Sequence, residues 1–335
     1  MLTNIVIFFL ALSIVFYVLF AGADFGAGVL EYITGRRHRQ VVADAIGPVW
    51  EANHVWLVLV VVILFMGFPS IYSAMSLYLH IPLLLMLVGI IFRGTAFTFM
   101  HYDAIKDQSS RVYDAVFKIS SIITPLFLGM IVGAAMLGRI NPEAESFSEA
   151  FISPWLNLFS LSVGLFCLVL FTFLAAVYMI GETDEEPERK AFIRAGKQLN
   201  MAAVVVGGGV FIAAEWNGLP LLALFGESPV SLGSLVVTTL LLPVLWISLQ
   251  HSWVLWSRLL AGAQVVLILF AWFWVQHPVV INMGASDPPL TVYSAAAPPA
   301  TMLQLVIALI VGAAIILPFL YYLMKTFKAG QFKQG

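Results

Sequence analysis

Long apolar runs alternate with short polar segments along the whole chain. Several runs approach about 20 residues, the length that a helix needs to cross the hydrocarbon layer of a membrane. Lipid admits only helices and closed barrels, and barrel strands alternate rather than form unbroken apolar runs. The pattern predicts an all-α polytopic membrane protein with nine transmembrane helices. They are expected at Leu2–Ile33, Ala45–Met66, Ser73–His101, Ala115–Leu137, Trp155–Ile180, Leu199–Phe225, Leu232–Gln250, Trp253–Trp274 and Thr301–Met324.

The composition agrees with this pattern. Of the 335 residues, 61% are hydrophobic and 10% are charged, and the mean hydropathy is +0.99. A soluble domain carries about 25% charged residues. The net charge of −2 gives no indication of a nucleic-acid partner, and the single cysteine, Cys167, cannot form an internal disulfide.

The basic residues are confined almost entirely to one side of the predicted helices. All but two of the 16 Lys and Arg residues lie near the ends of odd-numbered spans. The exceptions are Arg139, on the opposite side, and Arg93, inside a span. The positive-inside rule therefore predicts an outside N-terminus and a cytoplasmic C-terminus.

The longest charged stretch, Gly181–Lys197, lies near the middle of the chain. Four spans precede the helix that leads into it, and four follow. We expect two four-helix bundles, at 1–140 and 141–276. The region 277–335 is expected to hold an outer loop, one C-terminal helix and a cytoplasmic tail.

Apart from residues near the span ends, three charged residues fall inside the spans of the first bundle: Asp24, Glu51 and Arg93. An ionisable group in a span costs about 2.5–3.5 kcal/mol on insertion scales, so a functional role is the first hypothesis. Distance along the chain from the basic segments puts all three between mid-membrane and the cytoplasmic side. Arg93 is expected to be a structural charge partner of the carboxylates, because its planar fork can hold a carboxylate at two points. A purely structural ion-pair network is the alternative.

The start of the second span combines a carboxylate with an imidazole. Glu51 and His54 are three residues apart and so share one helix face, which also carries Asn53. Such a pair can pass a proton, since histidine titrates near neutral pH. The residues predict a proton pathway through Glu51, Asp24, His54 and Asn53, although His54 by itself would also suit packing.

Two residue types in the same region suggest packing. Gly22, Gly26 and Gly28 have the spacing that lets helices approach closely. Trp50 and Trp56 are expected at interfaces. No span carries a clear histidine at mid-depth, so we expect neither a haem iron ligand nor another metal site in this chain.

Three motifs occur in order along the first three spans: Gly22–Gly28 (GADFGAG), Ile46–Trp56 (IGPVWEANHVW) and Phe92–Gly94 (FRG). With the outer loop Asp287–Thr301 and the nine-helix layout, the chain resembles subunit II of cytochrome bd-type quinol oxidases, including the cyanide-insensitive oxidases. The resemblance covers nearly the whole chain.

The resemblance implies a non-haem subunit in a heterodimer with a haem-bearing subunit I. That partner would carry haems b and d (or b alone), oxidise quinol and reduce dioxygen to water with protons from the cytoplasm. The complex would lie in the cytoplasmic membrane of a bacterium or archaeon, with possible small accessory subunits. The position of Glu51 is acidic in the family and is associated with a proton path, and some members hold a structural quinone or lipid in subunit II.

Two other functions fit the residues. A stand-alone proton-coupled membrane transporter would also need many spans and buried carboxylates, although its site is expected near the midplane between interrupted helices. A purely structural partner would use the polar residues only to hold helices together.

Overall fold

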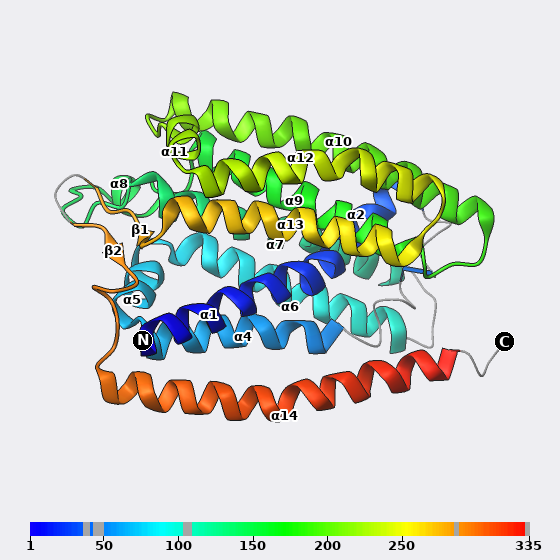
Figure 1. Ribbon diagram of the computed structural model, residues 1–335, viewed down its shortest axis with the longest axis horizontal. Coiled ribbons are helices and arrows are strands. Elements are labelled where there is room, and N and C mark those ends of the chain that lie inside the picture. The colour runs from blue at the N-terminus through cyan, green and yellow to red at the C-terminus, as the bar shows by residue number, and fades with distance from the viewer. Residues whose placement is uncertain (36–40, 43–49, 103–108, 285–287, 332–335) are drawn as a thin grey trace.

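Figure 1 shows long helices that run side by side in a computed structural model of the protein. The structure describes residues 1–35, 41–42, 50–102, 109–284 and 288–331, and at 50–52, 101–102, 109–110, 321 and 323–331 it describes the backbone alone. Among the described residues, eight helices are long and apolar enough to cross a membrane, and one bent pair of helices makes a ninth candidate. The predicted all-α membrane fold is confirmed.

The elements follow one another with short connections. In chain order they are α1 (Leu2–Phe16), a π-helical turn (Tyr17–Ala21), α2 (Gly22–Thr34), α4 (Trp50–Gly67), α5 (Pro69–Tyr78), α6 (His80–Tyr102), α7 (Ser109–Leu137), α8 (Phe147–Phe151), α9 (Leu158–Met179), α10 (Glu186–Trp216), α11 (Leu221–Glu227), α12 (Pro229–Gln250), α13 (Val254–Gln276), β1 (Val279–Ile281), β2 (Leu290–Thr291) and α14 (Pro299–Gln331).

The third span differs from the sequence prediction in where it begins. The third was expected to begin at Ser73, but Ser73 lies in α5, and α6 begins only at His80. The chain turns by 114° between the helices on either side of Phe68, whose φ of −136° is not helical. Pro69 starts the new helix because proline lacks the N–H that a continuing helix would need.

The prediction for the sixth span was also wrong at both ends. Much of the charged stretch Gly181–Lys197, which the prediction places between two spans, is helical: α10 begins at Glu186 with Pro187 in its first turn. The helix ends at Trp216, followed by Gly218 with a φ of +82°, a conformation that favours glycine. Leu221–Glu227 then forms the separate helix α11 instead of extending the span.

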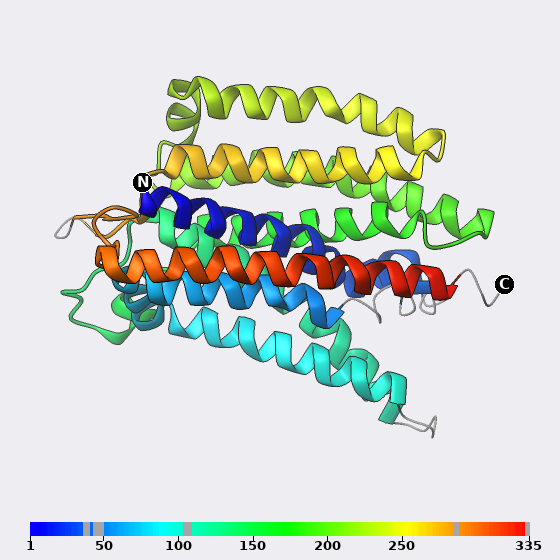
Figure 2. The same cartoon turned by 60° about the horizontal axis from the view of Figure 1, so that its bottom comes forward.

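Helix α9 joins the two halves of the chain. It packs against α2, α7 and α10, and one buried apolar cluster contains residues of both predicted bundles. Two close approaches depend on glycine: a Cβ on Gly26 would lie 2.0 Å from the carbonyl oxygen of Phe171, and a Cβ on Gly164 would lie 2.5 Å from that of Leu126. The last helix, α14, lies against α1 and α4 (Figure 2).

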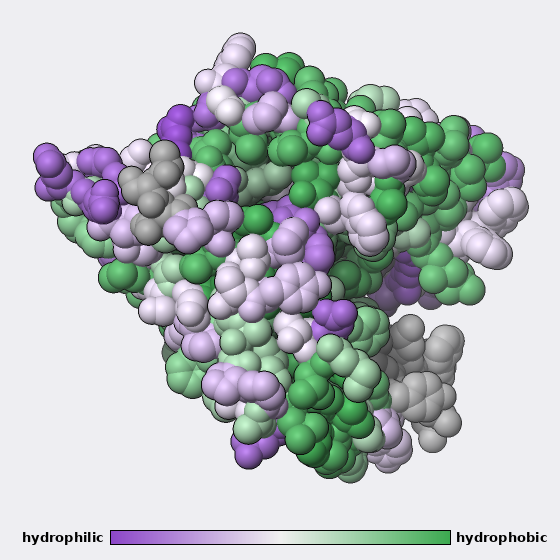
Figure 3. All heavy atoms as spheres, turned by 60° about the vertical axis from the view of Figure 1, so that its left-hand side comes forward, coloured by the Kyte–Doolittle hydropathy of each residue, from purple (hydrophilic) through white to green (hydrophobic). Residues whose placement is uncertain are grey.

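One end of the molecule carries most of the short elements, including β1, β2, α5 and α8 (Figure 1). The β1–β2 pair is antiparallel, and the amide of Ala297 donates to the carbonyl of Gly67 at 2.8 Å. Hydrophilic residues gather over this end, while the flanks of the helices are largely hydrophobic (Figure 3). This distribution is what a protein surrounded by lipid at its sides requires.

The contact at Gly26 gives a test of the fold. We expect Gly26→Ala to destabilise the protein by about 2–3 kcal/mol, because the new methyl group meets backbone atoms that cannot move independently. Gly209→Ala is the control, since a Cβ there meets no atom within 4 Å. The midpoint of thermal unfolding in detergent should fall for Gly26→Ala and stay unchanged or rise for Gly209→Ala; equal midpoints would contradict the close approach.

Candidate functional site

Asp24 lies in the first turn of α2, on a stretch of the helix that is buried almost without interruption. The residue is 4% exposed, and α2 packs against α7 and α9. A carboxylate in such surroundings needs a cation or hydrogen-bond donors, since a lone buried charge is very costly.

Arg93 of α6 supplies that cation. Its Nη1 donates to Asp24 Oδ2 at 2.9 Å and its Nη2 to Asp24 Oδ1 at 2.7 Å, and Nη2 also donates to the backbone carbonyl of Asp24 at 2.8 Å. Arg93 is 1% exposed. Both carboxylate oxygens therefore accept from the same guanidinium, the two-point contact predicted for Arg93.

The rest of the guanidinium is enclosed by α7 and by aromatic rings. Arg93 Nε donates to Ser121 Oγ at 3.2 Å, and that hydroxyl donates to the carbonyl of Phe117 at 2.7 Å. The guanidinium carbon lies 4.9 Å from the ring centroids of Phe25 and Phe117. The ion pair thus ties α2, α6 and α7 together.

A second buried ionic cluster lies further along the contact between α2 and α7. Lys118 Nζ is 3.0 Å from Glu31 Oε1 and 3.0 Å from Asp114 Oδ2, and all three side chains are at most 7% exposed. Sequence reasoning did not identify Glu31 or Asp114. Two signals were available: Glu31 follows Asp24 by seven residues and so shares its helix face, and Asp114 precedes Lys118 by four.

The start of α4 lies beside this region. The His54 ring centroid is 5.8 Å from that of Phe25 and 6.4 Å from that of Tyr17, and Asn53 is 9% exposed. The Phe25 ring contacts both His54 and the guanidinium carbon of Arg93. His54 is therefore separated from the buried ion pair by one aromatic side chain.

Two predicted residues of α4 lie partly outside the described structure. The side chains of Trp50 and Glu51 are not among the described residues, so the expected pairing of Glu51 with His54 stays a prediction. Trp56 is described: it is 8% exposed, and its ring centroid lies 4.5 Å from that of Phe16 on α1.

The predicted glycines lie at helix contacts. A Cβ on Gly22 would lie 2.9 Å from the ring of Phe171, and a Cβ on Gly28 would lie 2.2 Å from Ser121 Oγ. Gly28 therefore leaves room for the hydroxyl that binds Arg93, which connects the helix packing with the ion pair.

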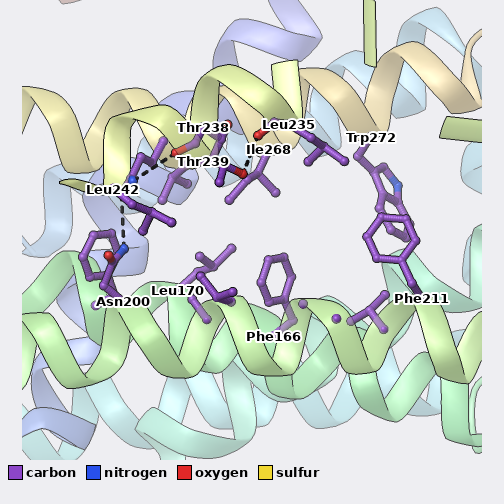
Figure 4. A pocket seen from close by; sticks show the side chains of 18 of the residues that line it. Phe166, Leu170, Asn200, Phe211, Leu235, Thr238, Thr239, Leu242, Ile268 and Trp272 are labelled. Atoms are coloured by element: carbon purple, nitrogen blue, oxygen red, sulfur yellow. Dashed lines mark hydrogen bonds between the residues drawn. The ribbon is translucent and has the colours of Figure 1, made fainter. Parts of the chain in front are cut away.

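A cavity of about 260 Å³ lies in the second half of the chain, among α9, α10, α11, α12 and α13 (Figure 4). Its walls are mostly apolar, and Asn200 and Trp272 lie toward opposite ends. At the polar end, Asn200 Nδ2 donates to Gln264 Oε1 at 3.2 Å and Trp246 Nε1 donates to Asn200 Oδ1 at 3.1 Å. The cavity suits a long apolar chain with a small polar group.

Two of the described histidines lie at helix ends. His80 Nδ1 lies 2.8 Å from the carbonyl of Leu77, and His251 Nδ1 lies 2.9 Å from that of Ile247. Within the described part of the chain, no three His, Cys, Asp or Glu side chains gather as they would around a metal ion.

Comparison with known proteins agrees with the resemblance seen in the sequence. Residues 2–327 match the family model of cytochrome bd terminal oxidase subunit II. The chain is 27% identical over 282 residues to cytochrome bd ubiquinol oxidase subunit 2 of Bacillus subtilis, covering 82% of this chain and 80% of the relative. It is 25% identical over 201 residues to cytochrome bd-I ubiquinol oxidase subunit 2 of Escherichia coli K12, covering 58% of this chain and 52% of the relative.

The fold has a solved counterpart as well. A chain of the bd oxidase from Geobacillus thermodenitrificans superposes with a TM-score of 0.77 at 20% identity, covering 97% of this chain and 98% of that one. The structural likeness shows a common fold, and the family model covers nearly the whole sequence. The chain therefore belongs to the cytochrome bd terminal oxidase subunit II family.

Proposed function

We propose that the chain is the non-haem subunit II of a bd-type terminal oxidase, which oxidises quinol and reduces dioxygen to water. The family match over residues 2–327 carries this proposal. A haem-bearing subunit I would be its partner in a heterodimer, with accessory subunits possible, and the haems of subunit I would supply the dioxygen chemistry. The complex would lie in the cytoplasmic membrane of a bacterium or archaeon, with the basic ends of the helices toward the cytoplasm.

The specific contribution that we propose for this chain is a proton path from the cytoplasmic side. Glu51 and His54 are three residues apart at the start of α4, and the His54 ring packs against Phe25, which also contacts the guanidinium of Arg93. Because both oxygens of Asp24 accept from Arg93, we assign Asp24 the role of a fixed negative charge beside the path. Glu51 and His54 would carry the proton, and Asn53 would line the path.

The test is Glu51→Gln in the intact complex. Glutamine keeps the shape and hydrogen bonding of the side chain but cannot release a proton, so we expect slower oxygen consumption, by about 10²-fold if this route is essential. Assembly and haem content should stay normal, and Glu51→Asp is the conservative control. Normal turnover in Glu51→Gln would remove Glu51 from any essential path.

A stand-alone proton-coupled transporter is the competing function. It would work without a second subunit, so proton-coupled uptake of a solute by this chain alone in lipid vesicles would contradict the oxidase proposal. We expect no such uptake.

The Asp24–Arg93 ion pair leads to a prediction about assembly of the complex, in contrast to the prediction about turnover for Glu51. We expect Arg93→Met to reduce the yield of the assembled complex more than Arg93→Lys, because methionine leaves a buried carboxylate unpaired at a cost of about 3–5 kcal/mol. Lysine keeps the charge but loses the two-point contact. The double variant Asp24→Leu/Arg93→Met removes both charges and should recover yield over Arg93→Met. Equal yields for the two single variants would contradict a structural pair.

We further propose that the cavity of the second half holds the apolar tail of a quinone or lipid. Gly208 lines the cavity and a Cβ there meets no atom within 4 Å, so Gly208→Leu should fill the space without a clash. Gly209→Leu is the matched control, since Gly209 is equally open but does not line the cavity. Mass spectrometry of molecules extracted from the purified complex should show one quinone or lipid lost in Gly208→Leu only. Its retention in both variants would contradict the assignment.

A further inference from the structure

Tyr17 opens the π-helical turn between α1 and α2, and its hydroxyl is enclosed by protein. The residue is 3% exposed, yet Tyr17 Oη makes no hydrogen bond to any described residue. A buried tyrosine hydroxyl normally finds a partner, because leaving one without any costs about 1–3 kcal/mol. The hydroxyl therefore lacks the hydrogen-bond partner that a buried tyrosine normally has.

The π-helical turn determines where this hydroxyl lies. The amide of Gly22 donates to the carbonyl of Tyr17, five residues earlier, so the turn contains one residue more than an α-helical turn. This extra residue rotates the face of α1 relative to that of α2. Tyr17 and Phe25 consequently both lie against His54 of α4, with ring centroids 6.4 and 5.8 Å from the imidazole.

The groups around Tyr17 are those of the proposed path. Tyr17 and Phe25 both pack against His54, and Phe25 also contacts the guanidinium of Arg93. The Asp24 oxygens already accept from Arg93, and Tyr17 Oη has no direct bond to them. A small ligand that can both donate and accept would satisfy the hydroxyl beside these groups.

We propose that Tyr17 Oη binds an internal water molecule that links the hydroxyl to the His54 side of α4. Internal waters typically make about three hydrogen bonds to buried polar groups that otherwise lack partners. When such a water takes part in proton transfer, it accepts one proton and releases another. Both the water and the tyrosine hydroxyl are therefore the same species before and after the transfer. Tyr17 is then a positioning residue for the proton path, and this inference rests on the proposed function.

Tyr17→Phe tests the inference in the intact complex, because it removes only the hydroxyl and keeps the ring. We expect oxygen consumption to fall about tenfold, as for the loss of one well-made hydrogen bond. The solvent isotope effect on turnover in D2O should rise, and haem content should not change. A purely structural role would leave the isotope effect as in the unmodified complex. Tyr178→Phe, which removes a hydroxyl from α9 outside the path, should leave turnover and isotope effect unchanged.

Thermal unfolding of the same complexes tests the water separately. If Oη holds a water, Tyr17→Phe loses those hydrogen bonds and should lower the unfolding midpoint. A raised midpoint would mean that the mutation removed an unsatisfied hydroxyl, and it would overturn the inference. Normal turnover in Tyr17→Phe with slow turnover in Glu51→Gln would also overturn it while leaving the proposed path intact. Normal turnover in both variants would reject both.

Discussion

Charge inside a membrane is tolerated only where it is paired, and the pairing of Asp24 with Arg93 organises the first half of this protein. The guanidinium binds both oxygens and the backbone carbonyl of one residue, and aromatic rings cover its faces. Three helices meet at this point because each contributes a group that the others need. Without the pair, α2 would place an isolated carboxylate among apolar side chains.

Buried polar contacts continue along the interface between α2 and α7. Gly28 makes room for Ser121, which holds Arg93, and Lys118 joins Glu31 and Asp114 further along. The ion pair of Lys118 with Glu31 fixes the relative rotation of α2 and α7, because a rotation of either helix would separate charges that lipid cannot solvate. The side of α2 that lies toward α1 and α4 is then fixed in position, and the rings of Tyr17 and His54 pack against each other there.

The ion pair fixes the structure, and separate groups are left for proton transfer. This arrangement fits the proposal that the partner subunit carries out the redox chemistry. Because both oxygens of Asp24 accept from Arg93, the proton path that we propose runs through the neighbouring groups on α4. Under the proposed function the polar residues of this chain serve two purposes: the Asp24–Arg93 ion pair fixes the helices, and Glu51, His54 and Tyr17 with its water would conduct protons beside it.

The sequence predicts the apolar spans and the Asp24–Arg93 pair well, since both follow from hydropathy and from the cost of charge in lipid. It predicts the helix ends poorly. The turn at Phe68 depends on how α4 and α5 pack, and α10 extends into a charged segment that hydropathy assigns to a linker. Lys118 was interpreted as a basic residue near a helix end. Its partner Glu31 comes from another helix that becomes adjacent only on folding, whereas Asp114 lies one turn earlier on α7 and was a local signal. The cavity lined by Asn200 forms between several helices, and no local sequence pattern predicts how those helices are placed relative to one another.

The most direct measurement is the visible absorption spectrum of the complex purified through a tag on this chain, recorded before and after quinol is added. The account predicts haem bands from a co-purified subunit I that become reduced on quinol addition and reoxidise in air. A colourless protein that purifies alone, from membranes where the chain is stably inserted, would contradict it.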